Sequence, residues 1–491
     1  MPSTTHLHEQ FLLITLLAIL TLSGCSDDDD DDDDKVASPF PAGAIMLPAD
    51  ATLTTAAKNA LINAKSGDVI VFPEGTYAIQ STLTFDADSD GDGIPVDNIT
   101  LIGHGQDKTI LNFATSSGGD GLFIQNGRNV TIKDLAVNEA AANAIKLKNT
   151  DGIRIQSVAT VWEGALDENN GAYGLYPVES SNILIEDSYV RGSADAGIYV
   201  GQSENIVVRR NLAKENVAGI EIENSINADV YDNRAEANTG GILIFDLPIG
   251  NGIYGTNVRV FDNVITANNT VNFARVGDFA GGVHIVPPGT GVIVLSTNDV
   301  EIYANQISDH QTTSVAVTSY YIADDQLSYM NPTYTSAIDD GWNAVPRSID
   351  IHDNIITNSG FAPAGSLIAD LITGYQMIHG AFPTILYDGL GELIANIGAD
   401  PATAGQPFDD AASVCASNNG GVSHGVVYDP AGDGSAISTT PDFLFEASPA
   451  DLLTCAQPLT ALTPAKVTIG GETFGCGADD ATDASATSCG L

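Results

Sequence analysis

An aspartate-rich stretch, residues 86–97, has the residue types and the spacing of a cation-binding loop. It reads DADSDGDGIPVD, so carboxylates stand at positions 1, 3, 5, 7 and 12 when counting starts at Asp86. Oxygen ligands at alternate positions around a glycine turn suit a hard cation of the size of Ca²⁺. The sequence therefore predicts a calcium site with these candidate ligands: Asp86, Asp88, Asp90, Asp92 and Asp97.

Two other interpretations of this stretch remain open. Counting from Asp88 also fits as far as Gly93, but it puts Ile99 at position 12. In the first register the closing residue is Asp97, which is shorter than the usual bidentate Glu. The stretch resembles the calcium loops of EF-hand proteins and thrombospondin type 3 repeats. An acidic hairpin that holds no ion is the alternative.

A column of aromatic and charged side chains forms a second candidate site. Seven segments share an alternating apolar pattern: GLFIQ from Gly121, AIKLK from Ala144, GLYPV from Gly174, GIYVG from Gly197, GIEIE from Gly219, GILIF from Gly241 and GVHIV from Gly282. Alternate side chains of a strand point to opposite faces, so the apolar set points inward. The outward column, with the tyrosine that precedes GLYPV, supplies the candidate ligand face: Lys146, Tyr173, Tyr176, Tyr199, Glu221 and His284.

The residue types of this column suit a sugar-binding surface. Tyrosine rings stack on pyranose faces, while Lys and Glu side chains hydrogen-bond to hydroxyl groups. The alternative is a set of solvent-facing side chains without a common role, or a face that long insertions cover. The candidate insertions are residues 247–256, 266–280 and 320–345.

The sequence does not predict a catalytic set on this face. Lys146 and Lys148 are candidate bases for a calcium-dependent lyase, but no Asp cluster occupies the neighbouring outward positions. Glu221 and Glu223 lie two residues apart on one strand face, which fits a hydrolase pair by spacing alone. The sequence contains no Gly-x-Ser-x-Gly elbow, His-Glu-x-x-His motif or phosphate-binding glycine loop.

A two-part repeat must position these side chains. Strand starts recur at Asn98, Asn129, Gly152, Asn182, Asn205, Ala228, Asn257, Asp299 and Ser348, and the intervals are 31, 23, 30, 23, 23, 29, 42 and 49. A recurring interval of about 23 with longer exceptions indicates a three-strand coil with loop insertions. Stacked coils would align the polar residue that ends each run into a ladder: Ser188, Asn211, Asn233, Asn263, Asn305 and Asn354.

The predicted fold class is all-β, a right-handed parallel β-helix with three sheets at residues 48–360. A helix at Thr52–Lys65, with Leu53, Ala57, Leu61 and Ile62 on its apolar face, caps the N-terminal end. The repeat ends after Gly360, and residues 361–491 are expected to cap the other end as a loop-rich, partly helical region. Its cysteines predict two disulfides with the pairing open: Cys415, Cys455, Cys476 and Cys489.

The N-terminus has the features of an exported, lipid-anchored protein. Residues 11–22 form an apolar run of signal-peptide length that ends in Leu-Ser-Gly-Cys25, which resembles a bacterial lipobox. Residues 1–25 are therefore expected to be a signal peptide with Cys25 as the lipidated residue. Residues 26–47 contain eight consecutive aspartates and are expected to be an extended acidic tether. The predicted location is the outer membrane, with membrane contact only through the lipid anchor.

The net charge is −45, from 63 acidic and 18 basic residues. This argues against a nucleic-acid partner, because phosphate binding relies on Lys and Arg stripes. We expect a monomer whose partner is a polysaccharide or an envelope protein, with Ca²⁺ as the cofactor.

The repeats, the phrase YGLYP…GIYVGQS…GIEIENS and the lipobox resemble a family of bacterial parallel β-helix repeat lipoproteins over residues 51–360. The wider pectate-lyase-like superfamily includes alginate lyases and mannuronan C5-epimerases. The epimerases carry Tyr-Gly-hydrophobic-Asp-Pro-His; here Tyr173, Gly174 and Pro177 match, but Tyr176 and Val178 replace Asp and His. Valine cannot transfer a proton, so the resemblance implies a shared strand shape without epimerase chemistry.

The sequence thus predicts an envelope lipoprotein whose β-helix binds a polysaccharide or a partner. One alternative is a lyase, epimerase or hydrolase that acts on an acidic glycan. The other is a structural or adhesive surface protein.

Overall fold

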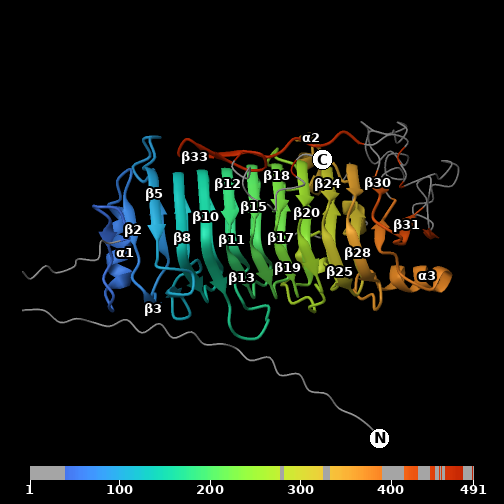
Figure 1. The fold of residues 1–491 in the computed structure, drawn as a ribbon, viewed down its shortest axis with the longest axis horizontal. Helices are drawn as coiled ribbons and strands as arrows, with labels where there is room; N and C mark the ends of the chain where they lie inside the picture. The colour runs from blue at the N-terminus through green and yellow to red at the C-terminus, as the bar shows by residue number, and fades with distance from the viewer. Residues whose placement is uncertain are drawn as a thin grey trace, which may run out of the picture. The chain divides into compact units, whose positions relative to one another are not determined.

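The repeated segments form short parallel strands that stack coil upon coil into a solenoid (Figure 1). The computed structural model describes residues 39–276, 281–324, 332–389, 414–428, 443–447, 453, 455, 459–478 and 489. The chain divides into two units, residues 1–42 and 43–491, and the solenoid belongs to the second. The signal peptide, Cys25 and the aspartate run lie outside the described residues.

Most coils contribute one strand to each of three faces, as the repeat predicts. Face 1 contains β1 (Ile45–Met46), β2 (Val69–Val71), β5 (Asp97–Ile102), the first parts of β8 (Arg128–Asn138) and β10 (Asp151–Val161), β12 (Ser181–Glu186), β15 (Glu204–Arg209), β18 (Ile226–Tyr231), β21 (Thr256–Phe261), β24 (Asn298–Tyr303), β27 (Arg347–His352) and β30 (Val414–Ser417). Face 2 contains β3 (Gly75–Ala78), β6 (Thr109–Asn112), the second parts of β8 and β10, β13 (Tyr189–Arg191), β16 (Leu212–Lys214), β19 (Arg234–Glu236), β22 (Val264–Thr266), β25 (Gln306–His310) and β28 (Ile355–Ser359).

Face 3 carries the candidate ligand-binding column. It contains β4 (Leu83–Asp86), β7 (Leu122–Gln125), β9 (Asn143–Lys148), β11 (Tyr173–Val178), β14 (Ala196–Gly201), β17 (Ala218–Glu223), β20 (Gly240–Phe245), β23 (Thr290–Leu295), β26 (Thr313–Thr318), β29 (Ile385–Tyr387), β31 (His424–Tyr428) and β32 (Phe443–Ala447). All these neighbours pair in parallel except β31 and β32, which are antiparallel.

The corners between faces are sharp because single residues there adopt left-handed backbone. Between faces 1 and 2 the φ angles are 55° at Asp187, 55° at Arg210 and 53° at Asp232. Between faces 3 and 1 they are 46° at Gln202 and 46° at Asn224. One left-handed residue turns the chain without a loop, so neighbouring coils keep their register.

Inward side chains and amide ladders hold the coils together. The inward apolar residues of all three faces form one buried core, for example Ile183 of face 1, Val190 of face 2 and Ile198 of face 3. The predicted ladder is confirmed: the backbone N–H of Ser188 donates to Asn211 Oδ1, and that of Asn211 donates to Asn233 Oδ1, each over 3.0 Å. The same pattern repeats through the later coils, where Asn263, Asn305, Asn354 and Asn419 continue the ladder. The ladder amides from Asn211 to Asn354 therefore each find a partner in the next coil.

The N-terminal helix α1 (Leu53–Ile62) covers the first coil, as predicted. Leu53, Ala57 and Leu61 are buried against the core, but Ile62 is 72% exposed, so its assignment to the apolar face was wrong. Strand β1 pairs with β2, which places residues 45–46 in the solenoid rather than in the acidic tether.

The solenoid continues past the predicted end at Gly360. Helix α3 (Ala369–His379) interrupts the chain as expected, and β29, β30 and β31 then add a further coil. The antiparallel strand β32 ends face 3. The boundary at residue 360 is therefore too early, because long insertions hide the last repeat from the periodic pattern.

The C-terminal strap, residues 459–478, does not cap the end of the solenoid but runs back along face 1 (Figure 1). Thr463 donates from its backbone N–H to Asn257, Thr468 to Asn182 and Gly470 to Asn129. The strap contains the hairpin β33 (Val467–Ile469) and β34 (Glu472–Phe474). It packs on outward side chains of face 1: Leu184, Val207, Tyr231, Phe261 and Tyr303.

Both predicted disulfides form, and the structure assigns the pairing that the sequence left open. Cys415 is bonded to Cys455, and Cys476 is bonded to Cys489. Cys476 of the second bridge lies in the strap and is buried. Within the described part of the chain, no helix is long and apolar enough to span a membrane.

Candidate functional site

Face 3 is open at its N-terminal coils and covered at its later coils. The outward column runs through Phe123, Lys146, Tyr176, Tyr199, Glu221, Leu243 and Ile293, with neighbouring residues in parallel register. The first three of these side chains are partly exposed, whereas the exposed fraction is 4% at Tyr199 and 1% at Glu221. The structure therefore brings Lys146, Tyr176, Tyr199 and Glu221 together, and part of this column lies under insertions.

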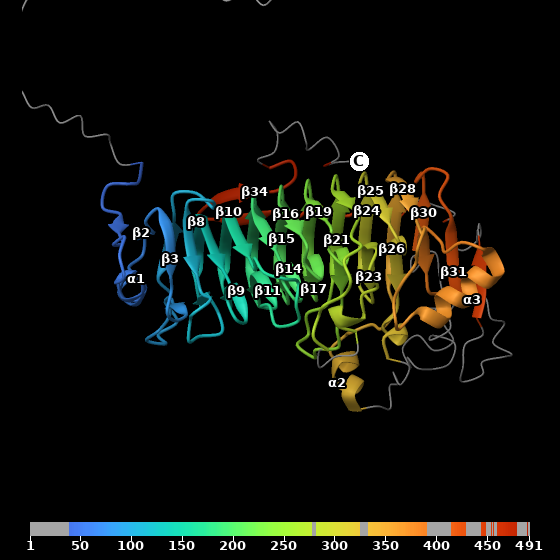
Figure 2. The same ribbon diagram turned by 90° about the horizontal axis from the view of Figure 1, so that it is seen from below.

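Apolar side chains from three insertions form the cover. The insertion after β20 contributes Leu247, the insertion after β22 contributes Val283, and the insertion after β26 contributes Tyr320 and Trp342. Helix α2 (Pro332–Asp339) belongs to the third insertion and lies outside the strands (Figure 2). These residues pack on Tyr199, Leu243 and Phe245. The cover thus begins beside the tyrosines and ends the open part of face 3 there.

His284 does not belong to the column, so its predicted position was wrong. Residues Val283–Ile285 form a short 3-10 helix, and the strand that pairs with β20 is β23. Ile293 occupies the place expected for His284, opposite Leu243. The sequence GVIVL at Gly291 has the same alternation as GVHIV, and Pro287 and Pro288 follow the latter segment. Proline lacks the N–H donor that a central strand needs.

Three tyrosines pack against one another where the open surface meets the cover. The ring centroids are 4.4 Å apart for Tyr173 and Tyr176, 4.6 Å for Tyr173 and Tyr199, and 5.0 Å for Tyr176 and Tyr199. We call these residues the tyrosine cluster. Tyr173 and Tyr176 are partly exposed. Lys146 Nζ lies 5.0 Å from the Tyr176 ring centroid, so a positive charge borders the exposed rings.

Three carboxyl groups lie next to the tyrosine cluster. Glu221 and Glu223 are outward residues of β17 and are almost fully buried, while Asp195 immediately precedes β14 and is partly exposed. Glu223 Oε1 accepts hydrogen bonds from Tyr199 Oη over 2.7 Å and from Gln202 Nε2 over 3.0 Å. We call Asp195, Glu221 and Glu223 the carboxyl cluster.

Burial and mutual repulsion raise the pKa values of these carboxyl groups. Burial, and then the Glu223 carboxylate, raise the pKa of Asp195 to about 7, although a hydrogen bond with Tyr173 opposes the shift. Burial raises the pKa of Glu223 to about 7 against the hydrogen bonds from Tyr199 and Gln202. Burial, followed by the charges of Asp195 and Glu223, also raises the pKa of Glu221. The cluster can therefore hold and release protons near neutral pH.

The sequence predicted Glu221 as part of the face and noted Glu223 beside it, but it missed Asp195 and Gln202. Asp195 lies in the corner before its strand, outside the alternating pattern. Gln202 follows the strand and turns back through its left-handed backbone, with φ 46°. Residues in the corners lie outside the alternating apolar pattern of the strands, so that pattern does not predict which way their side chains point. The one available hint was that polar residues flank the GIYVG segment on both sides.

Gly201 creates the space in which Tyr199 lies. A Cβ atom at Gly201 would stand 2.3 Å from Tyr199 Oη and 2.4 Å from its ring. Gly201 is the register neighbour of Glu223 on β17. The missing side chain lets the Tyr199 ring lie along its own strand and reach the carboxylate of the next coil.

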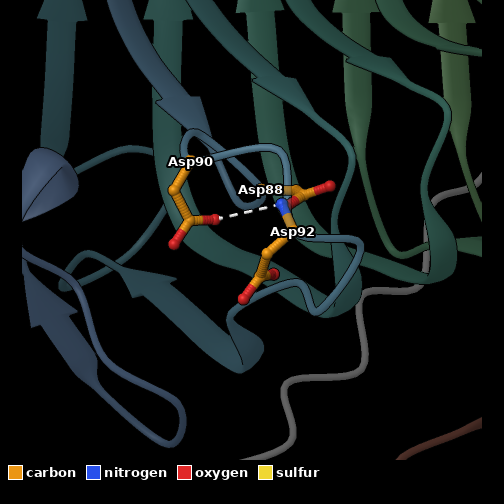
Figure 3. A group of neighbouring side chains, drawn as sticks. All are labelled: Asp88, Asp90 and Asp92. Carbon is orange, nitrogen blue, oxygen red and sulfur yellow. Dashed lines mark hydrogen bonds between the residues drawn. The ribbon is translucent and has the colours of Figure 1, made fainter.

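The aspartate-rich loop forms a smaller cluster than the sequence predicted (Figure 3). Asp88, Asp90 and Asp92 each offer a carboxylate oxygen within 4.8 Å of the others. Both carboxylate oxygens of Asp88 accept from the Gly93 backbone N–H at 3.2 Å. Asp90 accepts from the Asp92 backbone N–H at 3.4 Å (Figure 3). This arrangement matches the register that starts at Asp88.

Asp86 and Asp97 accept hydrogen bonds from other partners, so the structure does not bring them together with Asp88, Asp90 and Asp92. Asp86 ends β4 and accepts hydrogen bonds from Gln125 over 2.6 Å and from Asn126 over 2.9 Å. Asp97 begins β5 and accepts from Asn129 over 2.7 Å. Hydrogen bonds to side chains of the next coil hold both carboxylates in place. Calcium binding by the remaining three carboxylates stays a prediction.

A polar groove of about 500 Å³ lies along the corner between faces 3 and 1. It extends from Asp88 in the aspartate-rich loop past Asn149 and Glu179 to Gln202 and Glu204. Gln202 is thus shared between the groove and the hydrogen bonds of Glu223. The groove therefore borders the carboxyl cluster at Gln202.

Comparison with known proteins supports the fold. The family profile described as "Right handed beta helix region" matches residues 120–307, which confirms the predicted right-handed parallel β-helix. No curated protein sequence gives a significant match.

Several solved structures are similar to the chain at low identity. The A-module of a mannuronan C-5 epimerase from Azotobacter vinelandii is 18% identical, with a TM-score of 0.37 over 63% of this chain and 82% of its own. An alginate lyase from Paenibacillus sp. is 16% identical, with a TM-score of 0.37 over 62% of this chain and 95% of its own. A polygalacturonase from Erwinia carotovora ssp. carotovora is 14% identical, with a TM-score of 0.36 over 58% and 94%.

Proposed function

We propose that this protein binds polysaccharide through the open part of face 3, with the tyrosine cluster as the centre of the site. The observation that carries the proposal is the packing of Tyr173 and Tyr176, both partly exposed, beside Lys146. Aromatic rings offer flat apolar surfaces to sugar rings, and nearby polar groups fix the sugar hydroxyls.

The surroundings of the tyrosines favour an extended ligand. Polar side chains continue along the same face: Asn143 Nδ2 donates to Asp120 Oδ1 over 2.7 Å, and Lys148 pairs with Glu179 over 3.2 Å. The cover over the later coils blocks one direction along the solenoid axis. A chain-like ligand would therefore lie over β7, β9 and β11, with one end at the cover.

A second candidate is hydrolysis or another acid–base reaction on the bound glycan. The carboxyl cluster favours it, because a carboxyl group with a pKa near 7 can act as a general acid while a neighbouring carboxylate acts as the base. Strongly shifted pKa values also gather at functional sites. Glu221 and Glu223 are nearly buried, however, so binding remains the first proposal.

We also propose that the mature chain is a lipoprotein of the outer membrane, anchored through Cys25. The apolar run and the Leu-Ser-Gly-Cys25 sequence support this assignment. Metabolic labelling with radioactive palmitate should mark the full-length protein and should fail for Cys25→Ser. Labelling of that variant would refute the anchor but would leave the binding proposal untouched.

The binding proposal is tested with the chain from Ser26 onward on a glycan panel, with and without Ca²⁺. Binding should fall in Tyr176→Ala and persist in Tyr189→Ala, which changes a partly exposed tyrosine on face 2 of the same coil. Equal binding by both variants would refute the site. New reducing ends or unsaturated uronate products would establish the second candidate, and no binding to any glycan would overturn the proposal.

A further inference from the structure

We propose that the glycan bound at the tyrosine cluster carries amino groups, and that the carboxyl cluster binds a positively charged sugar amine. The inference rests on the proposed polysaccharide binding and specifies its ligand class. It starts from the absence of a cationic partner for these acids among the described residues.

Two buried carboxylates of face 1 have arginine partners, whereas the buried Asp246 accepts hydrogen bonds from the Gly255 backbone N–H. Glu186 on face 1 forms ion pairs of 2.8 Å with each of Arg154, Arg209 and Arg210. Asp229 pairs with Arg259 over 2.5 Å. These pairs follow the general rule that a buried charge is stable only when it is paired and hydrogen-bonded.

The carboxyl cluster breaks this rule. Within the described part of the chain, no Lys, Arg or His forms an ion pair with Asp195, Glu221 or Glu223, and Glu223 receives only neutral donors, Tyr199 and Gln202. Glu221 is 1% exposed, and its Oε2 atom has no hydrogen-bond partner there. Three facing acids without a cation are costly to fold, and a ligand that supplies the cation would offset this cost.

A metal ion fits this set less well than an organic cation. The described residues contain one group of three acids whose ligand oxygens approach within 4.8 Å of one another, and that group is Asp88, Asp90 and Asp92. The carboxyl cluster does not converge in this way. Its acids lie instead beside aromatic rings, and aromatic rings with carboxylates bind ammonium groups through cation–π attraction and charged hydrogen bonds.

Solvent reaches the cluster at its partly exposed members. Asp195, Tyr173 and Tyr176 are partly exposed, whereas Glu221 and Glu223 are buried. A sugar amine over Tyr173 would form an ion pair with Asp195. The two buried glutamates would add electrostatic attraction, which is screened less in the protein interior than in water. A uronate carboxylate at the same place would be repelled by the ionised members of the carboxyl cluster, against the attraction of Lys146 beside Tyr176.

The test measures binding of the chain from Ser26 onward to three oligosaccharides of equal length by calorimetry at pH 7, where Asp195 and Glu223 are substantially ionised: glucosamine oligomers, their fully N-acetylated forms and oligogalacturonate. The glucosamine oligomers should bind at least about tenfold more tightly than the acetylated forms, the change expected when one charged hydrogen bond is lost. Oligogalacturonate should bind most weakly.

Variants locate the preference. Asp195→Asn should remove most of the difference between glucosamine and its acetylated form, and Glu472→Gln, an exposed acid of the strap on face 1, should preserve it. The inference fails if both forms bind equally, if Asp195→Asn keeps the preference, or if oligogalacturonate binds best. Each of these results can occur while Tyr176→Ala still weakens binding, so they leave the proposed function standing. Loss of all glycan binding would overturn both.

Discussion

The Tyr199 hydroxyl donates a hydrogen bond of 2.7 Å to Glu223 Oε1 across the neighbouring strands β14 and β17. Both side chains are nearly buried, at 4% and 7% exposure. Gly201 leaves room for the tyrosine ring, and Gln202 donates to the same carboxylate oxygen. The bond therefore links the tyrosine cluster to the carboxyl cluster, and it stabilises the charged form of Glu223 in particular.

Tyr199→Phe should destabilise the protein more above pH 8 than at pH 5. The variant keeps the ring but removes a donor to a buried carboxylate, which costs about 1–3 kcal/mol when the carboxylate is ionised. Urea unfolding at the two pH values measures the difference, with Tyr189→Phe on face 2 as the control. An equal loss at both pH values would show that the hydroxyl does not stabilise the ionised carboxylate.

The carboxyl cluster should make the free energy of unfolding fall as pH rises from about 4 to above 7. The pKa of Glu223 is about 7 in the folded protein against 4.5 ordinarily, so over this range the unfolded chain holds fewer protons. The stabilisation is complete below about pH 4 and is lost as pH rises through 7. A shift of this size corresponds to about 3 kcal/mol.

Glu223→Gln should flatten this decline and should be more stable than the native protein at pH 8. Urea midpoints between pH 4 and pH 8.5 give the profile. Glu204→Gln removes one exposed acid and controls for the general repulsion of a chain with net charge −45. Parallel profiles for Glu223→Gln and the native protein would contradict the raised pKa.

The sequence alone was sufficient to predict the solenoid and its ladder. Inward apolar residues recur at period two, and each turn ends on Asn or Ser, so local patterns and stacked contacts agree. GVHIV at Gly282 and GVIVL at Gly291 carry the same alternation, and the choice between them depends on how an insertion folds. His284 was misplaced for this reason.

Contacts between distant parts of the chain were beyond the periodic pattern. Gly470 of the strap donates a hydrogen bond to Asn129, and no sequence pattern in either segment predicts this contact. Asp195 is a corner residue whose neighbours come from three coils. The tyrosines could be predicted from strand alternation, but the burial of Tyr199 and Glu221 depends on insertions such as the one that contains Trp342.

His310→Asn should remove an acid-sensitive step from the stability profile. His310 is fully buried at the end of a second ladder, where its Nε2 lies 3.1 Å from Asn268 Nδ2, and burial lowers its pKa to about 4. In the unfolded chain this histidine takes up a proton near pH 6.5. The unfolded state is therefore favoured as pH falls from 6.5 towards 4, and the free energy of unfolding decreases by about 3 kcal/mol over this range.

Asparagine continues the ladder chemistry without a titrating group, since Asn216, Asn238 and Asn268 occupy the preceding rungs. The variant should match the native protein at pH 7.5 and exceed its urea midpoint at pH 5. His379→Asn, in the last turn of α3, serves as the control. A midpoint at pH 5 that remains at the native value would contradict the prediction.

The aspartate-rich loop should bind one Ca²⁺ through Asp88, Asp90 and Asp92, and Asp97→Asn should tell the two registers apart. The structure holds Asp97 against Asn129, so Asp97→Asn should keep the site, whereas Asp88→Asn with Asp90→Asn should abolish it. Ca²⁺ at a hundred times its Kd stabilises the folded state by about 2.7 kcal/mol, which a thermal shift detects. Calorimetry of the chain from Ser26 onward checks the stoichiometry. Absence of heat and of a thermal shift at millimolar Ca²⁺ would refute the site, and loss of binding in Asp97→Asn would favour the register that starts at Asp86.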